Sequence, residues 1–513
     1  MQLARAKSDP LAALAAMERF VRDSRQPVLF EAGDDALAVT PETFSLTARG
    51  NIVTVECWNQ TKNLVRRIRG IRSERRGRLE IEIERFGGLA GTLTFLDLAD
   101  PSNRDADRRG ARLKYRERFR SSLQRQFTGY RIAELSTEQD LHHSLSPSFP
   151  RALLRRGTAG IAAIGASEEA LSPDDSLSFG LIWLEHLRKR EPKIAIDTLA
   201  IFLPAGLENT SCHRVRHLTG AKYLVFVHQA NDEAQVDPRD YQNFDTRLPV
   251  AMRALAGASR RTVEWVERLL AVDGVERRDR PDGSLSLAVR GIEFARVAGD
   301  ELLFGFDRKH AAGGEAHIAE AERIAQELAR MRSFGAMDRG NPLYMRHPEA
   351  WLESQVRAQI ETLDAMIHRH PLYGQVPQFA AGERGIIDLL GVDRDGRLAV
   401  IELKAEEDIH LPLQALDYWM RVKWHLDRQE FSARGYFPGI ALTSATPRLL
   451  LVVPSLEYHP SNETILKYFS ADVPVERVGV GLEWRKELRI MFRFLSASWP
   501  SLSSARLKGH SPA

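Results

Sequence analysis

Apolar residues recur at two different spacings along the chain, and these spacings predict blocks of helices and strands. Residues 1–23 carry apolar side chains at helical spacing, so we expect a helix there. Between residues 43 and 98 the pattern changes to short β-rich runs, and Arg78–Arg85 alternates strictly, which is typical of a strand with one buried face. The polar stretch Asp97–Ala111 predicts a loop, and Leu113–Phe127 predicts an arginine-rich helix.

The middle of the chain predicts an α/β arrangement. Two amphipathic segments alternate with two apolar runs, Ile194–Leu203 and Tyr223–His228, so we expect parallel strands joined by helices. A helix around Thr262–Val272, several strands between residues 274 and 306, and a long helix at Glu315–Met331 follow. We find no internal repeat in the residue pattern.

The last third of the chain predicts a defined order of elements. These are a helix (Glu349–Met366), three strands (Val376–Phe379, Gly385–Val392 and Gly396–Lys404), a helix (Pro412–Leu426) and a strand (Arg448–Val453). The fold class that we expect is a multidomain mixture of α+β and α/β. Its parts are a β-rich domain with an arginine-rich helix (1–140), an α/β middle region (141–335), a third domain (336–495) and a flexible tail (496–513).

Composition narrows the class of protein. The chain has 513 residues, of which 43% are hydrophobic and 27% charged, which excludes wholesale disorder. No apolar run approaches the roughly 20 residues that cross a bilayer, and residues 1–20 lack the features of a secretory signal. The two cysteines, Cys57 and Cys212, are isolated, which favours a reducing compartment. We therefore expect a cytoplasmic protein with no membrane partner.

Basic residues concentrate in the N-terminal third. Lys62–Arg78 holds eight basic residues and one acidic residue, and Arg104–Arg131 holds ten and three. Such stretches can neutralise phosphates without reading a nucleic-acid sequence, whereas the alternative is an ordinary solvated surface. The candidate nucleic-acid contacts are Arg66, Arg67, Arg112, Arg116 and Arg120.

The residues that point to chemistry lie in two apolar runs on either side of Asp393-Arg-Asp-Gly396. This pattern predicts a hairpin in which Gly396 takes the left-handed position of a three-residue turn. Counting back from the turn places Asp388 directly opposite Glu402, with Lys404 on the same face. Two facing carboxylates repel each other, and a hard divalent cation removes that repulsion.

These residues resemble the PD-(D/E)xK, or restriction-endonuclease-like, nuclease superfamily. Asp388 followed by Glu402-Leu-Lys404 is similar to its D…(D/E)xK signature, with Ile387 in place of the proline. Glu353 matches the acid that the family often carries on the preceding helix. Gln414 and Tyr418 match the Q-x-x-x-Y of RecB-type and NucS-like members. The resemblance covers the final third of the chain and implies an αβββαβ core.

The resemblance implies a Mg²⁺- or Mn²⁺-dependent nuclease that hydrolyses phosphodiester bonds in DNA. Glu353, Asp388 and Glu402 would bind metal, and Lys404, with Asp388 and Glu402, would carry the catalytic chemistry. Gln414 and Tyr418 would support the site or contact substrate. A non-catalytic nucleic-acid-binding or scaffold protein of the same fold, and an enzyme acting on another substrate, stay open as alternatives, as does a homodimer.

Overall fold

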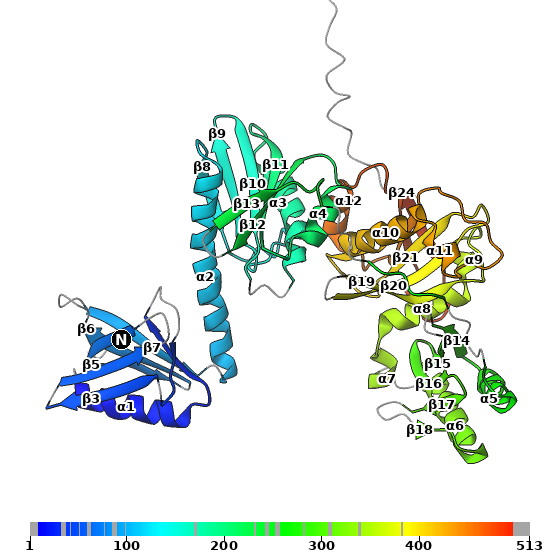
Figure 1. The fold of residues 1–513 in the computed structure, drawn as a ribbon, viewed down its shortest axis with the longest axis horizontal. Coiled ribbons are helices and arrows are strands. Elements are labelled where there is room, and N and C mark those ends of the chain that lie inside the picture. Colours follow the sequence, from blue (N-terminus) through cyan, green and yellow to red (C-terminus); the bar gives the residue numbers. More distant parts are fainter. Residues whose placement is uncertain are drawn as a thin grey trace, which may run out of the picture. The chain divides into compact units, whose positions relative to one another are not determined.

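The computed structural model of the chain has a mixed α+β architecture built around four sheets (Figure 1). It describes residues 9–31, 37–41, 43–50, 52–58, 63–75, 77–84, 90–97, 99–168, 172–229, 232–241, 246–251, 257–280, 283–305, 310–336, 340–380 and 383–495. The chain divides into two compact units, residues 1–127 and 128–513. The predicted tail, 496–513, lies outside the described residues.

The first unit is a seven-stranded antiparallel sheet with the strand order β2-β1-β7-β6-β5-β4-β3. In β6 (Arg78–Glu84), Leu79, Ile81 and Ile83 are buried, as the strict alternation predicted. Helix α1 packs its apolar face on this sheet. The other elements are α1 (Pro10–Asp23), β1 (Pro27–Glu31), β2 (Leu37–Ala38), β3 (Phe44–Arg49), β4 (Ile52–Trp58), β5 (Asn63–Arg75), β7 (Ala90–Asp97) and α2 (Pro101–Gln126).

The predicted loop at Asp97–Ala111 is wrong over most of its length, because α2 begins at Pro101. A proline is well tolerated in the first turn of a helix, and arginine and alanine are good helix formers. Polar composition therefore marked the first part of a long helix rather than a loop. The predicted boundary at residue 140 falls inside the second unit, whose first strand is β8 (Arg131–Ser136).

The predicted middle region contains two sheets. The first is six-stranded, in the order β13-β12-β11-β10-β9-β8, and its strands β10, β11 and β12 run parallel as expected. Its remaining elements are β9 (Arg151–Arg156), β10 (Ala159–Gly165), α3 (Ser176–Arg190), β11 (Ala195–Pro204), α4 (Asn209–Val215), β12 (Lys222–Gln229) and β13 (Asp232–Val236).

A five-stranded antiparallel sheet with two helices follows and has its own core. Helix α6 has the bounds that the apolar periodicity predicted. The elements are α5 (Arg260–Leu270), β14 (Val275–Asp279), β15 (Leu285–Val289), β16 (Ile292–Ala298), β17 (Glu301–Phe304), β18 (His310–Ala311) and α6 (Glu315–Met331).

The C-terminal sheet has six strands in the order β19-β20-β21-β22-β23-β24. Its elements are α7 (Pro342–Met345), α8 (Pro348–Ala358), α9 (Ile360–Leu363), β19 (Tyr373–Ala380), β20 (Glu383–Val392), β21 (Leu398–Leu403), α10 (Leu411–Asp427), α11 (Glu430–Ala433), β22 (Arg448–Pro454), α12 (Pro460–Leu466), β23 (Val475–Val480) and β24 (Ile490–Leu495). The last two strands were not predicted. Helices α8 and α10 pack on opposite faces of this sheet, each within its own apolar core.

Candidate active site

The hairpin of β20 and β21 has the predicted register. Leu389 pairs with Ile401 and Val392 pairs with Leu398. Gly396 has a φ of +77°, and a Cβ built there would lie 2.2 Å from the carbonyl oxygen of Ala441. The turn therefore requires glycine for both its backbone conformation and its close packing.

This register brings two carboxylates together inside the protein. Continued by one residue, it places Asp388 opposite Glu402, and Asp388 Oδ2 accepts a hydrogen bond of 2.9 Å from the N–H of Leu403. The Glu402 residue is only 1% exposed, and its Oε2 atom is buried without a hydrogen-bond partner among the described residues. The acids are thus not the solvated charges of a surface hairpin.

Both faces of the hairpin are buried. Leu389, Ile401 and Leu403 pack in the core beneath α8, as predicted for the face opposite the acids. Ile387, which was predicted to join them, packs in the other core. That core also contains Leu390 and Val400 and belongs to α10, so the acid pair lies at the end of an apolar layer.

The surroundings disfavour negative charge on both acids. Burial raises the pKa of Asp388 to about 7, and the nearby carboxylates of Glu353 and Glu349 act in the same direction. Burial, and then the charge of Asp388, raises the pKa of Glu402 well above its usual value. A compensating cation would stabilise both carboxylates.

Lys404 supplies part of that compensation. Its Nζ lies 3.5 Å from a carboxylate oxygen of Asp408, 3.6 Å from one of Glu349 and 3.9 Å from Glu402 Oε1. Burial disfavours the ammonium ion, but Glu402, Glu349 and Asp408 together raise the pKa of Lys404 above its usual value. Lys404 is therefore positively charged at neutral pH and lies next to the acid pair.

Glu353, which was predicted to bind metal together with the pair, lies close enough to raise the pKa of Asp388 and is itself held by two arginines. One Glu353 oxygen lies 2.9 Å from Arg357 and the other 3.3 Å from Arg278. These ion pairs neutralise the buried carboxylate. Glu349, one helical turn earlier on α8, is the acid of that helix that contacts Lys404. The four-residue spacing of Glu349 and Glu353 puts both on one face, so sequence could have suggested either.

Gln414 and Tyr418 lie together on α10. Gln414 Nε2 donates a hydrogen bond of 3.2 Å to Tyr418 Oη, as expected for residues one turn apart. Burial raises the pKa of Tyr418 to about 12, and the charges of Glu402 and Asp388 contribute to this rise. The tyrosine therefore stays neutral and lies close enough to the acid pair to sense its charge.

The donor set fits a magnesium-type ion better than a multi-ligand metal centre. Within the described ranges, no group of three or more His, Cys, Asp or Glu side chains is arranged to hold a metal ion. Mg²⁺, however, is commonly bound by one or two carboxylates and otherwise keeps water and phosphate oxygens. Asp388 and Glu402 provide two carboxylates, and the unpartnered Glu402 Oε2 is an open oxygen donor.

The predicted basic contacts lie in the first unit. Arg66 forms an ion pair with the buried Glu31, whereas its neighbour Arg67 is half exposed and lies 3.9 Å from Glu84. On α2, Arg120 and Arg116 lie 3.0 and 4.0 Å from the same carboxylate, Glu117. Arg112 is partly buried on that helix. Acidic neighbours therefore reduce the positive charge at Arg66, Arg67, Arg116 and Arg120.

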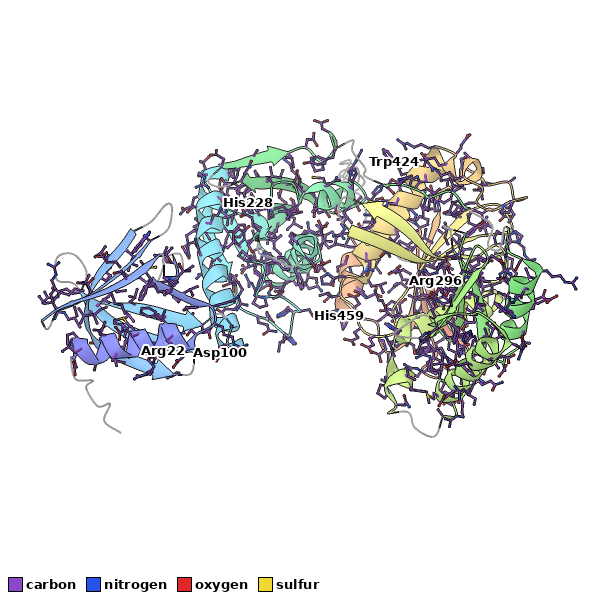
Figure 2. The ribbon with its side chains drawn as sticks, turned by 60° about the horizontal axis from the view of Figure 1, so that its bottom comes forward. Arg22, Asp100, His228, Arg296, Trp424 and His459 are labelled. Carbon is purple, nitrogen blue, oxygen red and sulfur yellow. The ribbon has the colours of Figure 1, made fainter. Side chains whose placement is uncertain are left out.

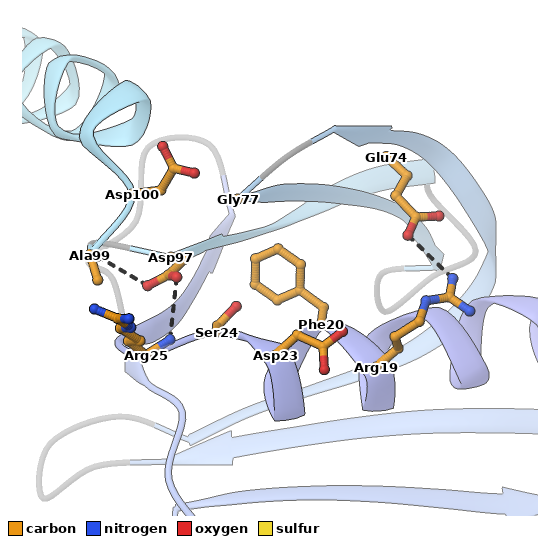
Figure 3. A pocket seen from close by; sticks show the side chains of 10 residues that line it. All are labelled: Arg19, Phe20, Asp23, Ser24, Arg25, Glu74, Gly77, Asp97, Ala99 and Asp100. Carbon is orange, nitrogen blue, oxygen red and sulfur yellow. Dashed lines mark hydrogen bonds and ion pairs between the residues drawn. The ribbon is translucent and has the colours of Figure 1, made fainter.

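A pocket in the first unit is lined mainly by charged groups that bind one another (Figure 3). Arg19 lies 3.2 Å from Glu74, and Asp97 accepts the backbone N–H groups of Arg25 and Ala99. These contacts join the end of α1 to the sheet. They engage Arg19, Glu74 and Asp97 within the first unit.

No family model matches this chain, and no curated protein sequence matches it. Among the described residues, no helix is long and apolar enough to cross a membrane.

Proposed function

We propose that the chain is a metal-dependent nuclease that hydrolyses phosphodiester bonds, with DNA as the expected substrate. The observation that carries this proposal is the pair of the buried Glu402 and the partly buried Asp388 beside the charged Lys404. An uncompensated pair of buried carboxylates is costly, and proteins retain such groups mainly where they bind or react.

The order and direction of the elements support a restriction-endonuclease-like core. Helix α8 precedes an antiparallel set, β19 to β21, and α10 then leads to β22, which runs parallel to β21. This is the αβββαβ order that the sequence resemblance implied. Two further strands, β23 and β24, extend the sheet beyond it.

Each residue has a role that follows from its position. Asp388 and Glu402 would hold the metal ion, which supplies a bound water of lowered pKa and a positive charge for the phosphate. Lys404 Nζ would orient the attacking water and stabilise charge developing on the phosphate oxygens. Tyr418 would hold Gln414 in place beside the acids. Glu349 and Asp408 keep Lys404 charged and positioned.

Substrate contacts in the first unit are a further part of this proposal. Arg67 is half exposed, and Arg112, Arg116 and Arg120 follow each other at four-residue spacing on α2. If they contact the phosphate backbone, affinity for DNA falls steeply with salt. A salt series comparing the chain with the triple variant Arg112→Ala, Arg116→Ala, Arg120→Ala measures the change in slope.

The decisive experiment incubates the full chain with labelled single-stranded, duplex and branched DNA, with and without Mg²⁺ or Mn²⁺. We expect cleavage only with metal, and only in a preparation that retains Asp388. Binding of DNA without cleavage of any substrate, under either metal, would favour the alternative of a non-catalytic nucleic-acid-binding protein.

A further inference from the structure

The two six-stranded sheets of the second unit have the same topology. We number the strands of each sheet one to six along the chain, from β8 to β13 and from β19 to β24. In both sheets, neighbouring strands among the first three are antiparallel, strands three, four and five are parallel, and strand six is antiparallel to strand five. One helix joins the third strand to the fourth in the middle sheet (α3), and α10 with the short α11 does so in the C-terminal sheet. In each sheet a short helix, α4 or α12, joins the fourth strand to the fifth. Helix α12 begins directly after His459, which is labelled in Figure 2.

One backbone hydrogen bond, made just after the third strand of each sheet, shows which residues of the two hairpins are equivalent. Lys404 N–H donates to the carbonyl of Val452, the partner of Leu403 (3.1 Å). Ala166 N–H donates in the same way to the carbonyl of Phe202, the partner of Gly165 (2.9 Å). Lys404 is therefore equivalent to Ala166.

The middle sheet lacks the acidic site. Two residues before Ala166 stands Ile164, equivalent to Glu402, and its cross-strand partner is Arg151, equivalent to Asp388. Arg151 lies over the ring of Trp183 on α3, 5.5 Å from its centroid, and donates to the carbonyl of Glu138. An isoleucine, an alanine and a buried arginine cannot hold a cation, so this position is catalytically silent.

The two sheets also dock reciprocally. Leu218 and Phe469, each three residues beyond the end of its short helix, form an antiparallel bridge. Thr219 N–H donates to the Tyr468 carbonyl (2.6 Å), and Ser470 N–H donates to the His217 carbonyl (2.8 Å).

The helices of the two sheets also make reciprocal contacts. On α4, Arg214 makes two hydrogen bonds, of 2.8 and 2.7 Å, to Asp417 of α10. Tyr468, just after α12, hydrogen-bonds Glu185 of α3 at 3.2 Å. The short helix of each six-stranded sheet thus contacts the long helix of the other sheet. One apolar core runs through both sheets. Such reciprocity is what a local two-fold relation produces.

We infer that residues 131–236 are a second, silent copy of the nuclease-like fold, which serves as a built-in partner for the first. One chain then contains two copies of the fold related by a local two-fold axis, and only the C-terminal copy has the acid site. The two strands of duplex DNA are related by two-fold symmetry, so each of the two copies of the fold would face one strand. With one functional site, the protein would therefore cut only one strand in each binding event. This inference rests on the proposed function, and it predicts that the protein is a monomeric enzyme that nicks duplex DNA.

The experiment combines sedimentation of the full chain with a time course on supercoiled circular DNA and Mg²⁺. A monomer is expected, because the pairing surface is already occupied within the chain; a stable dimer would overturn the inference. Nicked circles should accumulate first, and linear DNA should follow only through later independent cuts. Linear product appearing with the first nicks, made by a monomer, would show two working sites.

Two controls separate this inference from the proposed function. Asp388→Asn should remove all nicking, whereas residual nicking would come from the middle copy and would contradict its silence. If no DNA is cut under any condition, the proposed function fails, and the sedimentation result still decides whether the pair is built into one chain.

Discussion

The middle and C-terminal sheets share a topology, and they differ at the three positions to which we assign the chemistry of the proposed nuclease. The C-terminal hairpin carries the buried Glu402 and the partly buried Asp388 and Lys404, whereas the middle hairpin has Arg151, Ile164 and Ala166. The middle strand β10 has the apolar Ile164 where β21 carries Glu402, and β9 has Arg151 where β20 carries Asp388. A sheet of this topology therefore does not need the acids for its stability, which supports the proposal that Asp388 and Glu402 serve a function.

The largest effect is expected from Lys404→Ala, which makes the active hairpin resemble the silent one at this position. Loss of a charged donor beside the reacting phosphate typically costs about 10²–10³-fold in kcat. Cleavage assays should show such a loss while DNA binding persists. Lys423→Ala, which removes an α10 lysine paired with Asp427, is the matched control and should cleave normally. Equal cleavage by both variants would exclude Lys404 from the site.

The pH dependence of stability tests the acids without any substrate. The pKa of Asp388 is raised from 3.8 to about 7 in the folded state, so the folded protein holds this proton more tightly than the unfolded chain. Its contribution to stability is complete below about pH 4 and is lost as pH rises through 7. At roughly 1.4 kcal/mol per pH unit, the loss is on the order of 4 kcal/mol.

Denaturant melts of the metal-free chain at a series of pH values measure this loss. Asp388→Asn should show a shallower decline, because only Glu402 then retains a raised pKa. Mg²⁺ at millimolar concentration should restore stability at pH 8 in the wild type and not in the variant. A wild-type profile as flat as that of the variant would mean that Asp388 is not desolvated in the folded protein.

A smaller effect is expected at the contact between the two copies. Arg214→Met leaves Asp417 without its buried partner, which should lower the free energy of unfolding by about 3 kcal/mol. The double variant Arg214→Met, Asp417→Leu removes both charges and should recover most of the loss. Chemical denaturation measures both. If the single variant is as stable as the wild type, this ion pair does not hold the two copies together.

Sequence patterns gave the C-terminal hairpin in detail because its determinants are local. The alternation of apolar residues and the single glycine at Gly396 set both the register and the facing of Asp388 and Glu402. Helical spacing could not decide between Glu349 and Glu353. The ion pair that holds Glu353 could not be predicted either, because Arg278 comes from a separate sheet.

The second copy of the fold could not be found from residue patterns. Strand order and direction repeat between the two sheets, but the residues that identify the site do not, since Ile164 and Ala166 replace Glu402 and Lys404. A topology is maintained by apolar positions that many residues can fill. Only the hydrogen-bonded registers reveal that the two hairpins are equivalent.

The smallest effect on cleavage is expected from a substitution in α10, the helix that covers the C-terminal hairpin. Tyr418 of α10 accepts a hydrogen bond from Gln414 beside the acids, whereas Trp183 of α3 covers Arg151 in the silent copy. Tyr418→Phe removes one buried hydrogen bond, which contributes about 1 kcal/mol, so cleavage should fall only several-fold. Tyr436→Phe is the control, because Tyr436 Oη is buried without a hydrogen-bond partner among the described residues. Removing this hydroxyl should leave cleavage unchanged and should not lower the melting temperature. A loss in Tyr418→Phe as large as that in Lys404→Ala would instead place the Tyr418 hydroxyl in direct contact with the reacting group.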